Sequence, residues 1–176
     1  VAAMAARGTP FHGVLYAGLM MTADGPKVLE YNVRFGDPET QAVLTRLRSD
    51  LLELLDAATR PGGLAGVEIE WSDDWAVTVV LASGGYPASS SSGDEISGMR
   101  AVDSIEVELL HAGTAERDGR IVTAGGRVLN VTGIGSTPAE AREHAYRAAE
   151  KIQFDGKQMR RDIAERAVAR VEEVAG

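Results

Sequence analysis

Three side chains near residue 30 could together hold a metal ion and a phosphate group. The segment VLEYNVRFGDPETQ, residues 28–41, begins with the alternating apolar and polar residues of a strand. Glu30 and Asn32 then share one face, about 7 Å apart for a rise of roughly 3.3 Å per residue. A carboxylate beside an amide suits Mg²⁺, which needs few protein oxygens when substrate phosphates are present. Arg34 continues this polar face, where its guanidinium could bind a phosphate and neutralise charge on a transferred phosphoryl group.

The next four residues convert the strand into a helix. Gly36 permits a turn, Asp37 is a good N-cap and Pro38 fits the first helical position, where free backbone N–H groups attract anions. Asp37 and Glu39 add negative charge there, which favours an additional cationic amine or second metal. The competing interpretation is purely structural, because Glu and Asn on an exposed strand face are usually solvated and Asp-Pro-Glu is a common helix start.

A hairpin and a long helix must position these residues. Residues 13–33 contain two strand-like runs around Asp24-Gly25, a dipeptide that tolerates the positive φ of a tight turn. After Pro38, apolar residues recur at helical spacing as far as Leu55, and a Pro-Gly-Gly sequence follows at 61–63. The spacing predicts a single helix over 38–59.

The remaining sequence predicts a small, mostly antiparallel sheet and two helices. The expected strands, separated by Gly-rich turns, cover residues 75–83, 104–112, 119–123 and 126–134. Thr137, Pro138 and Glu140 form a capping box at the start of a helix over 138–151. A last helix over about 162–174 is expected to turn these residues inward: Ile163, Ala167, Val168, Val171 and Val174.

These elements predict an α+β fold with two domains. Residues 1–61 form the first, and residues 62–176 form a small β-rich domain with C-terminal helices. The chain begins at Val1 with the end of an Ala-rich helix, which suggests a fragment of a longer protein.

Composition excludes several classes of function. The net charge of −8 argues against nucleic-acid binding, which requires clustered Lys and Arg. The absence of Cys excludes disulfides and thiolate chemistry, so with only three His a metal would be bound mainly by oxygen. No apolar run is long enough to span a bilayer, and the first residues show no charged segment followed by an apolar signal core, so a cytoplasmic location is expected.

Two further residues are weaker candidates. His111 could be a ligand or proton carrier, although a single His at a strand end is more often structural. The glycines around Arg127 lack the spacing of a nucleotide-binding fingerprint, so Arg127 is expected to pin a turn or line a cleft.

The sequence resembles the glycinamide ribonucleotide synthetase family, also called phosphoribosylamine-glycine ligases. RFGDPETQ at 34–41 is very close to the family signature. The likeness continues in family order through these segments: SDLLELL (49–55), GGYP (84–87), GDEISG (93–98), HAGT (111–114), GGRVLNVT (125–132), AREHAY (141–146) and RRDI (160–163).

The resemblance implies an ATP-grasp ligase of purine biosynthesis that joins glycine to 5-phosphoribosylamine. ATP phosphorylates the glycine carboxylate, and the amine then attacks the glycyl phosphate. Glu30 and Asn32 match the family's Mg²⁺ (or Mn²⁺) ligands and Arg34 its basic residue beside the transferred phosphate. Residues 36–39, Gly36, Asp37, Pro38 and Glu39, match its substrate-side turn.

The resemblance covers only the C-terminal part of the family, the end of the ATP-grasp domain and the small domain that follows. The N-terminal half with the adenine site would lie upstream of Val1, so we expect this fragment to be inactive alone. The alternatives are another ATP-grasp carboxylate-amine ligase and a non-catalytic binding module that retains the fold.

Overall fold

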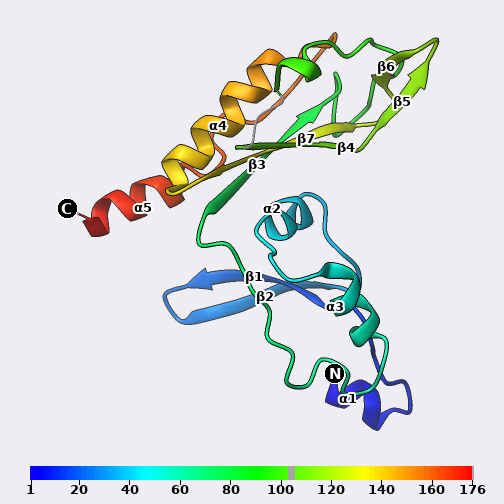
Figure 1. Cartoon of the computed structure of the whole chain (residues 1–176), viewed down its shortest axis with the longest axis vertical. Helices are drawn as coiled ribbons and strands as arrows, with labels where there is room; N and C mark the ends of the chain where they lie inside the picture. The colour runs from blue at the N-terminus through cyan, green and yellow to red at the C-terminus, as the bar shows by residue number, and fades with distance from the viewer. Residues whose placement is uncertain (103–105, 176) are drawn as a thin grey trace. The chain divides into compact units, whose positions relative to one another are not determined.

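The computed structural model describes residues 1–102 and 106–175, the last two without their side chains. The chain divides into two compact units. The first contains Val1–Thr40 and Leu47–Trp71, and the second contains Gln41–Arg46 and the chain from Ser72 onward. Helices and strands are mixed in the manner expected for an α+β fold (Figure 1). No helix among the described residues is long and apolar enough to cross a membrane.

The first unit is built on the predicted hairpin. After a short helix α1 (Ala2–Ala6), strand β1 (Tyr16–Thr22) pairs antiparallel with β2 (Gly25–Asn32). The register changes by one residue between Gly18 and Leu19, as in a β-bulge. Several apolar side chains of this hairpin are at least half exposed: Leu19, Met20, Leu29 and Tyr31.

The prediction of a single helix over 38–59 is wrong. The structure has two helices, α2 (Glu39–Thr45) and α3 (Leu51–Ala58), separated by residues 46–50. The intervening backbone pairs with a distant segment: the Arg48 N–H donates to the Glu70 carbonyl (2.9 Å), and the Ser72 N–H donates to the Arg46 carbonyl (2.7 Å). Asp50 then caps α3, because its carboxylate accepts from the N–H groups of two residues in the first turn.

The second unit has a three-stranded antiparallel sheet in the order β3-β7-β4. Its strands are β3 (Trp75–Ala82), β4 (Val107–His111) and the central β7 (Arg127–Gly135). A separate hairpin joins β5 (Thr114–Arg117) to β6 (Arg120–Thr123), and a 3-10 helix, η1, covers Met99–Val102. The four predicted strands are confirmed as β3, β4, β6 and β7, although residues 104 and 105 of one of them lie outside the described residues. The prediction that they share one sheet is wrong, because β6 pairs with β5, a strand that was not predicted.

Helix α4 (Pro138–Lys151) has the predicted bounds and lies along one face of the sheet (Figure 1). The Thr137 hydroxyl accepts from the Glu140 N–H (3.1 Å). The Glu140 carboxylate accepts from the Ser136 hydroxyl and N–H (both 2.7 Å), and these hydrogen bonds lower its pKa. Local signals therefore fix this end of the helix.

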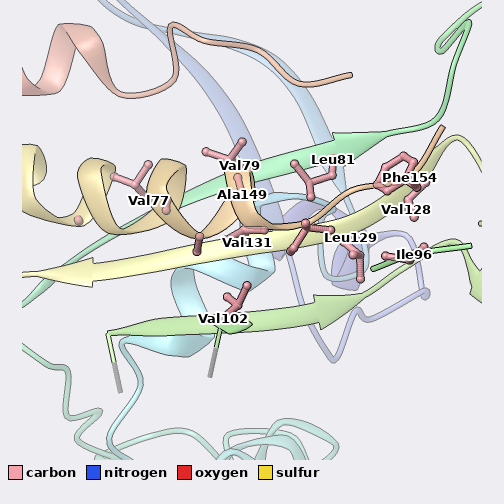
Figure 2. Packing of buried hydrophobic residues seen from close by; sticks show 14 residues of the cluster. Val77, Val79, Leu81, Ile96, Val102, Val128, Leu129, Val131, Ala149 and Phe154 are labelled. Carbon is pink, nitrogen blue, oxygen red and sulfur yellow. The ribbon is translucent and has the colours of Figure 1, made fainter. Parts of the chain in front are cut away.

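The core of the second unit lies between α4 and the sheet. Figure 2 shows Val77, Val79 and Leu81 of β3 beside Leu129 and Val131 of β7. Small residues on α4 allow the helix to approach the sheet closely: Ala141, Ala145, Ala148 and Ala149, all buried. This layer is the main apolar cluster among the described residues.

The last helix, α5 (Glu165–Ala175), begins three residues later than expected. Ala164 precedes it with a φ of 63°, outside the helical region. Ile163, Ala167 and Val168 are partly buried as predicted, whereas Val171 is 36% exposed, so its assignment to the interior is wrong. The side chain of Val174 lies outside the described part of the chain.

Asn130 is an anomaly in this packing and gives a first prediction. It is fully buried in the middle of β7, and neither atom of its amide has a hydrogen-bond partner among the described residues. A buried amide without partners costs about 1–3 kcal/mol, so Asn130→Val is expected to raise the stability by about 2 kcal/mol. Thermal unfolding should show a midpoint about 4–8 °C higher.

Thr132 is the matched control for Asn130. It is also fully buried on β7, two residues further along, but its hydroxyl lies 2.8 Å from that of Thr78. Thr132→Val removes a satisfied partner and should lower the midpoint. A lower midpoint for Asn130→Val as well would show that an internal water satisfies the Asn130 amide.

Candidate functional site

Strand β2 places Glu30 and Asn32 side by side, as the alternation predicts. The Asn32 amide nitrogen donates to a Glu30 carboxylate oxygen (3.0 Å), which requires both side chains on one face. Glu30 is exposed and Asn32 is half-buried. The hydrogen bond leaves the amide oxygen of Asn32 and the other carboxylate oxygen of Glu30 available to a ligand.

Gly18 on β1 leaves space for the Glu30 side chain of this pair. It lies directly opposite Glu30 in the hairpin register. A Cβ atom at position 18 would lie 3.1 Å from Cγ of Glu30, which is closer than side chains normally pack. The missing side chain therefore allows Glu30 to lie flat across β1.

Arg34 lies beyond the end of the strand that carries Glu30 and Asn32. Strand β2 ends at Asn32, and the Arg34 guanidinium donates to the Phe35 carbonyl (3.1 Å). In the described part of the chain no hydrogen bond joins Arg34 to Glu30 or Asn32. Because the backbone bends at residues 33 and 34, strand alternation no longer determines the direction of the Arg34 side chain, and its role beside the phosphate stays a prediction.

The turn at residues 36–39 also differs in detail from the prediction. Helix α2 begins at Glu39, so Pro38 precedes the helix instead of being its first residue. The Thr40 N–H donates to the Gly36 carbonyl (3.1 Å), and the Asp37-Pro38 peptide bond is cis. Because α2 has only seven residues and begins with a carboxylate, its N-terminus adds little attraction for an anion.

Glu39 folds back over Gly36. A Cβ atom at position 36 would collide with a Glu39 carboxylate oxygen and would lie 3.2 Å from Cδ of Glu39. The absence of a side chain at Gly36 therefore gives the Glu39 carboxylate its position beside the turn.

Tyr16 is a residue of this site that the sequence reasoning missed. It lies directly opposite Asn32 in the register, and it is half-buried. Burial raises the pKa of Tyr16, and the negative charges of Glu39 and then Glu30 raise that pKa further. The hydroxyl thus lies within the field of both carboxylates.

The donor set fits a hard divalent cation that also binds substrate oxygens. Glu30 and Asn32 would supply one carboxylate and one amide oxygen, which is a typical protein contribution to a Mg²⁺-phosphate site. Among residues 1–102 and 106–175 there is no group of three or more His, Cys, Asp and Glu side chains that could hold a metal unaided.

His111 and Arg127, the two weaker candidates for functional residues, both contact neighbouring side chains. Nδ1 of His111 lies 2.9 Å from the Thr114 hydroxyl across the turn that follows β4. Nε of Arg127 donates to the Tyr86 hydroxyl (2.9 Å), and the guanidinium lies over the ring, 5.9 Å from its centroid. These contacts agree with the expectation that Arg127 pins a turn.

Comparison with known proteins places both units in one family. The family model described as phosphoribosylglycinamide synthetase, C domain, matches residues 76–166, more than half of the chain. The model of the ATP-grasp (A) domain of the same synthetase matches residues 1–40, which include Glu30, Asn32 and Arg34.

Individual relatives agree with the family models. The chain is 51% identical over 164 residues to phosphoribosylamine-glycine ligase of Caldanaerobacter subterraneus, covering 93% of this chain and 39% of that protein. It is 52% identical over 168 residues to the ligase of the same name from Streptomyces coelicolor, covering 93% and 40%. The chain thus spans about 40% of the length of these relatives.

A solved structure gives the same result for the fold. The crystal structure of phosphoribosylamine-glycine ligase from Thermotoga maritima matches with a TM-score of 0.67 and 43% identity. The match covers 84% of this chain and 36% of that one. With the family model over its C domain, these matches show that the chain belongs to the phosphoribosylglycinamide synthetase family.

Proposed function

We propose that this chain is part of an ATP-dependent phosphoribosylamine-glycine ligase of purine biosynthesis. The substrates would be ATP, glycine and 5-phosphoribosylamine, and the products glycinamide ribonucleotide, ADP and phosphate. The observation that carries the proposal is the Glu30-Asn32 pair on one strand face, within the segment that matches the ATP-grasp domain of this family.

The chain's own residues would have separate tasks. Glu30 and Asn32 would hold Mg²⁺ or Mn²⁺, which when bound neutralises phosphate charge and polarises the phosphoryl group. The Arg34 guanidinium would break its hydrogen bond to the Phe35 carbonyl and bind oxygens of the transferred phosphate. Gly36, Asp37, Pro38 and Glu39 would shape the substrate side, where the Glu39 carboxylate could bind an ammonium group.

The reaction would proceed through glycyl phosphate. A glycine carboxylate oxygen attacks the γ-phosphorus of ATP, and the bond to the leaving ADP oxygen breaks. The amine of phosphoribosylamine then attacks the glycyl carbon, phosphate leaves, and the amine loses a proton. The positive charge of Arg34 would stabilise the phosphate in both steps.

The first unit supports the proposal that activity requires a longer protein. Its hairpin exposes apolar side chains, and a two-stranded hairpin is at best marginally stable alone. We propose that the N-terminal half supplies the adenine site and covers this surface. The domain boundary between residues 61 and 62 and the cytoplasmic location stay predictions, as does the absence of a nucleic-acid or membrane partner.

Substrate omission tests the proposed function. The full-length protein should release ADP only with both glycine and phosphoribosylamine, and residues 1–176 alone should release none. ADP release with a different carboxylate and amine would identify another ATP-grasp ligase. No ADP release with any such pair would favour a non-catalytic module.

A further inference from the structure

We propose that Tyr16 is a positioning residue of the Glu30-Asn32 site, which holds Glu30 in its ligand geometry and brings Glu39 to the same place. The inference rests on the proposed function, because it concerns the side chains that would hold the divalent cation. Tyr16 itself would touch neither metal nor substrate.

The first support is the strand register. Tyr16 lies opposite Asn32, and Gly18 lies opposite Glu30. Residues directly opposite one another in an antiparallel pair share a face, with Cβ atoms about 4.5–5.5 Å apart. Tyr16 is therefore the direct neighbour of one proposed ligand and the diagonal neighbour of the other.

The second support is the space above Gly18. A Cβ atom there would lie 3.1 Å from Cγ of Glu30 and 3.7 Å from Cε1 of Tyr16. The Glu30 side chain and the Tyr16 ring thus lie over the same glycine. The Glu30 side chain packs over Gly18 with the Tyr16 ring beside it. These two contacts restrict the rotamers that Glu30 can adopt.

The third support is the approach of Glu39 from α2. Its carboxylate folds back over Gly36, and its charge acts on the Tyr16 hydroxyl together with that of Glu30. Carboxylates near one hydroxyl group are stabilised when that group donates a hydrogen bond to one of them. The Tyr16 hydroxyl is an uncharged donor suited to that role.

Groups that orient metal ligands typically change metal affinity or activity by 10–100-fold when they are lost. Tyr16→Phe keeps the ring and removes the hydroxyl, so it should weaken cation binding about tenfold. Gly18→Ala should also weaken cation binding, because the added methyl group displaces Glu30. Neither change removes a proposed ligand.

The experiment measures Mn²⁺ binding to the full-length protein by electron paramagnetic resonance. Tyr16→Phe should raise the Mn²⁺ dissociation constant about tenfold and raise KM for Mg²⁺-ATP more than it lowers kcat. Tyr31→Phe is the matched control, since Tyr31 is the adjacent residue to Glu30 on β2 and points to the opposite face. It should bind Mn²⁺ like the unchanged protein.

Glu30→Gln distinguishes failure of this inference from failure of the proposed function. If Glu30→Gln weakens Mn²⁺ binding while Tyr16→Phe does not, the positioning role of Tyr16 is wrong and the metal site stands. If Glu30→Gln also binds Mn²⁺ normally, the proposed metal site is wrong. If Tyr16→Phe fails to fold, Tyr16→Leu, which also removes the hydroxyl, decides the question by the same Mn²⁺ measurement.

Discussion

Glu30→Gln in the full-length protein is expected to lower kcat/KM for ATP by about 100- to 1,000-fold. A divalent cation contributes several kcal/mol to phosphoryl transfer, and each 1.4 kcal/mol corresponds to about a factor of ten in rate. Gln keeps the shape of the side chain and its carbonyl oxygen but removes the negative charge that holds the cation. Because Glu30 is exposed, the thermal unfolding midpoint should not change.

The dependence on Mg²⁺ concentration makes this prediction specific. If the loss comes from cation binding, a higher Mg²⁺ concentration should restore part of the activity of Glu30→Gln. Glu116→Gln, a change at an exposed position on β5, is the control and should behave like the unchanged protein. Unchanged turnover of Glu30→Gln at low Mg²⁺ would contradict the metal role.

Gly133→Ala is expected to destabilise the second unit by about 3 kcal/mol, because overpacking of a close contact costs about 1–3 kcal/mol or more. Position 133 on β7 faces α4. A Cβ atom there would collide with the Ala141 carbonyl oxygen and the Ala145 backbone nitrogen, and would lie 3.0 Å from Cα of Ala145. These are backbone atoms of the helix, so no change of rotamer can relieve the collision.

Thermal unfolding should show the effect as a midpoint about 6–12 °C lower, for about 2–4 °C per kcal/mol in a chain of this size. Gly84→Ala is the control, since its added methyl group would have its nearest contacts at 3.6 Å, with backbone atoms of Gly156, which is an ordinary van der Waals distance. Its cost should be about 1 kcal/mol or less. Equal midpoints for the two variants would show that α4 can move away from β7 without loss.

Elements with local signals were predictable from the sequence. Helix α4 has its predicted bounds because Thr137, Pro138 and Glu140 specify its start by hydrogen bonds within one turn. The hairpin was predictable because Asp24-Gly25 separates two strand-like runs. Alternation along β2 was also sufficient to place Glu30 and Asn32 on one face.

The break between α2 and α3 shows why periodicity failed. Apolar residues continue at helical spacing through 46–50, so the pattern contains no interruption. The break depends on backbone pairing with Glu70 and Ser72, more than twenty positions further along the chain. The only local signal was Asp50, which caps α3 and was available as an N-cap.

The sequence by itself determined the family, the hairpin and the shared face of Glu30 and Asn32, because these depend on residue type and on the period of one strand. The tertiary structure decided which residues of the neighbouring strand join the site. Without the irregularity between Gly18 and Leu19, the pairing of Leu19 with Val28 would continue and place Ala17 opposite Glu30. A shift of one residue reverses the faces of a strand, so this single bulge places Tyr16 and Gly18 opposite Asn32 and Glu30.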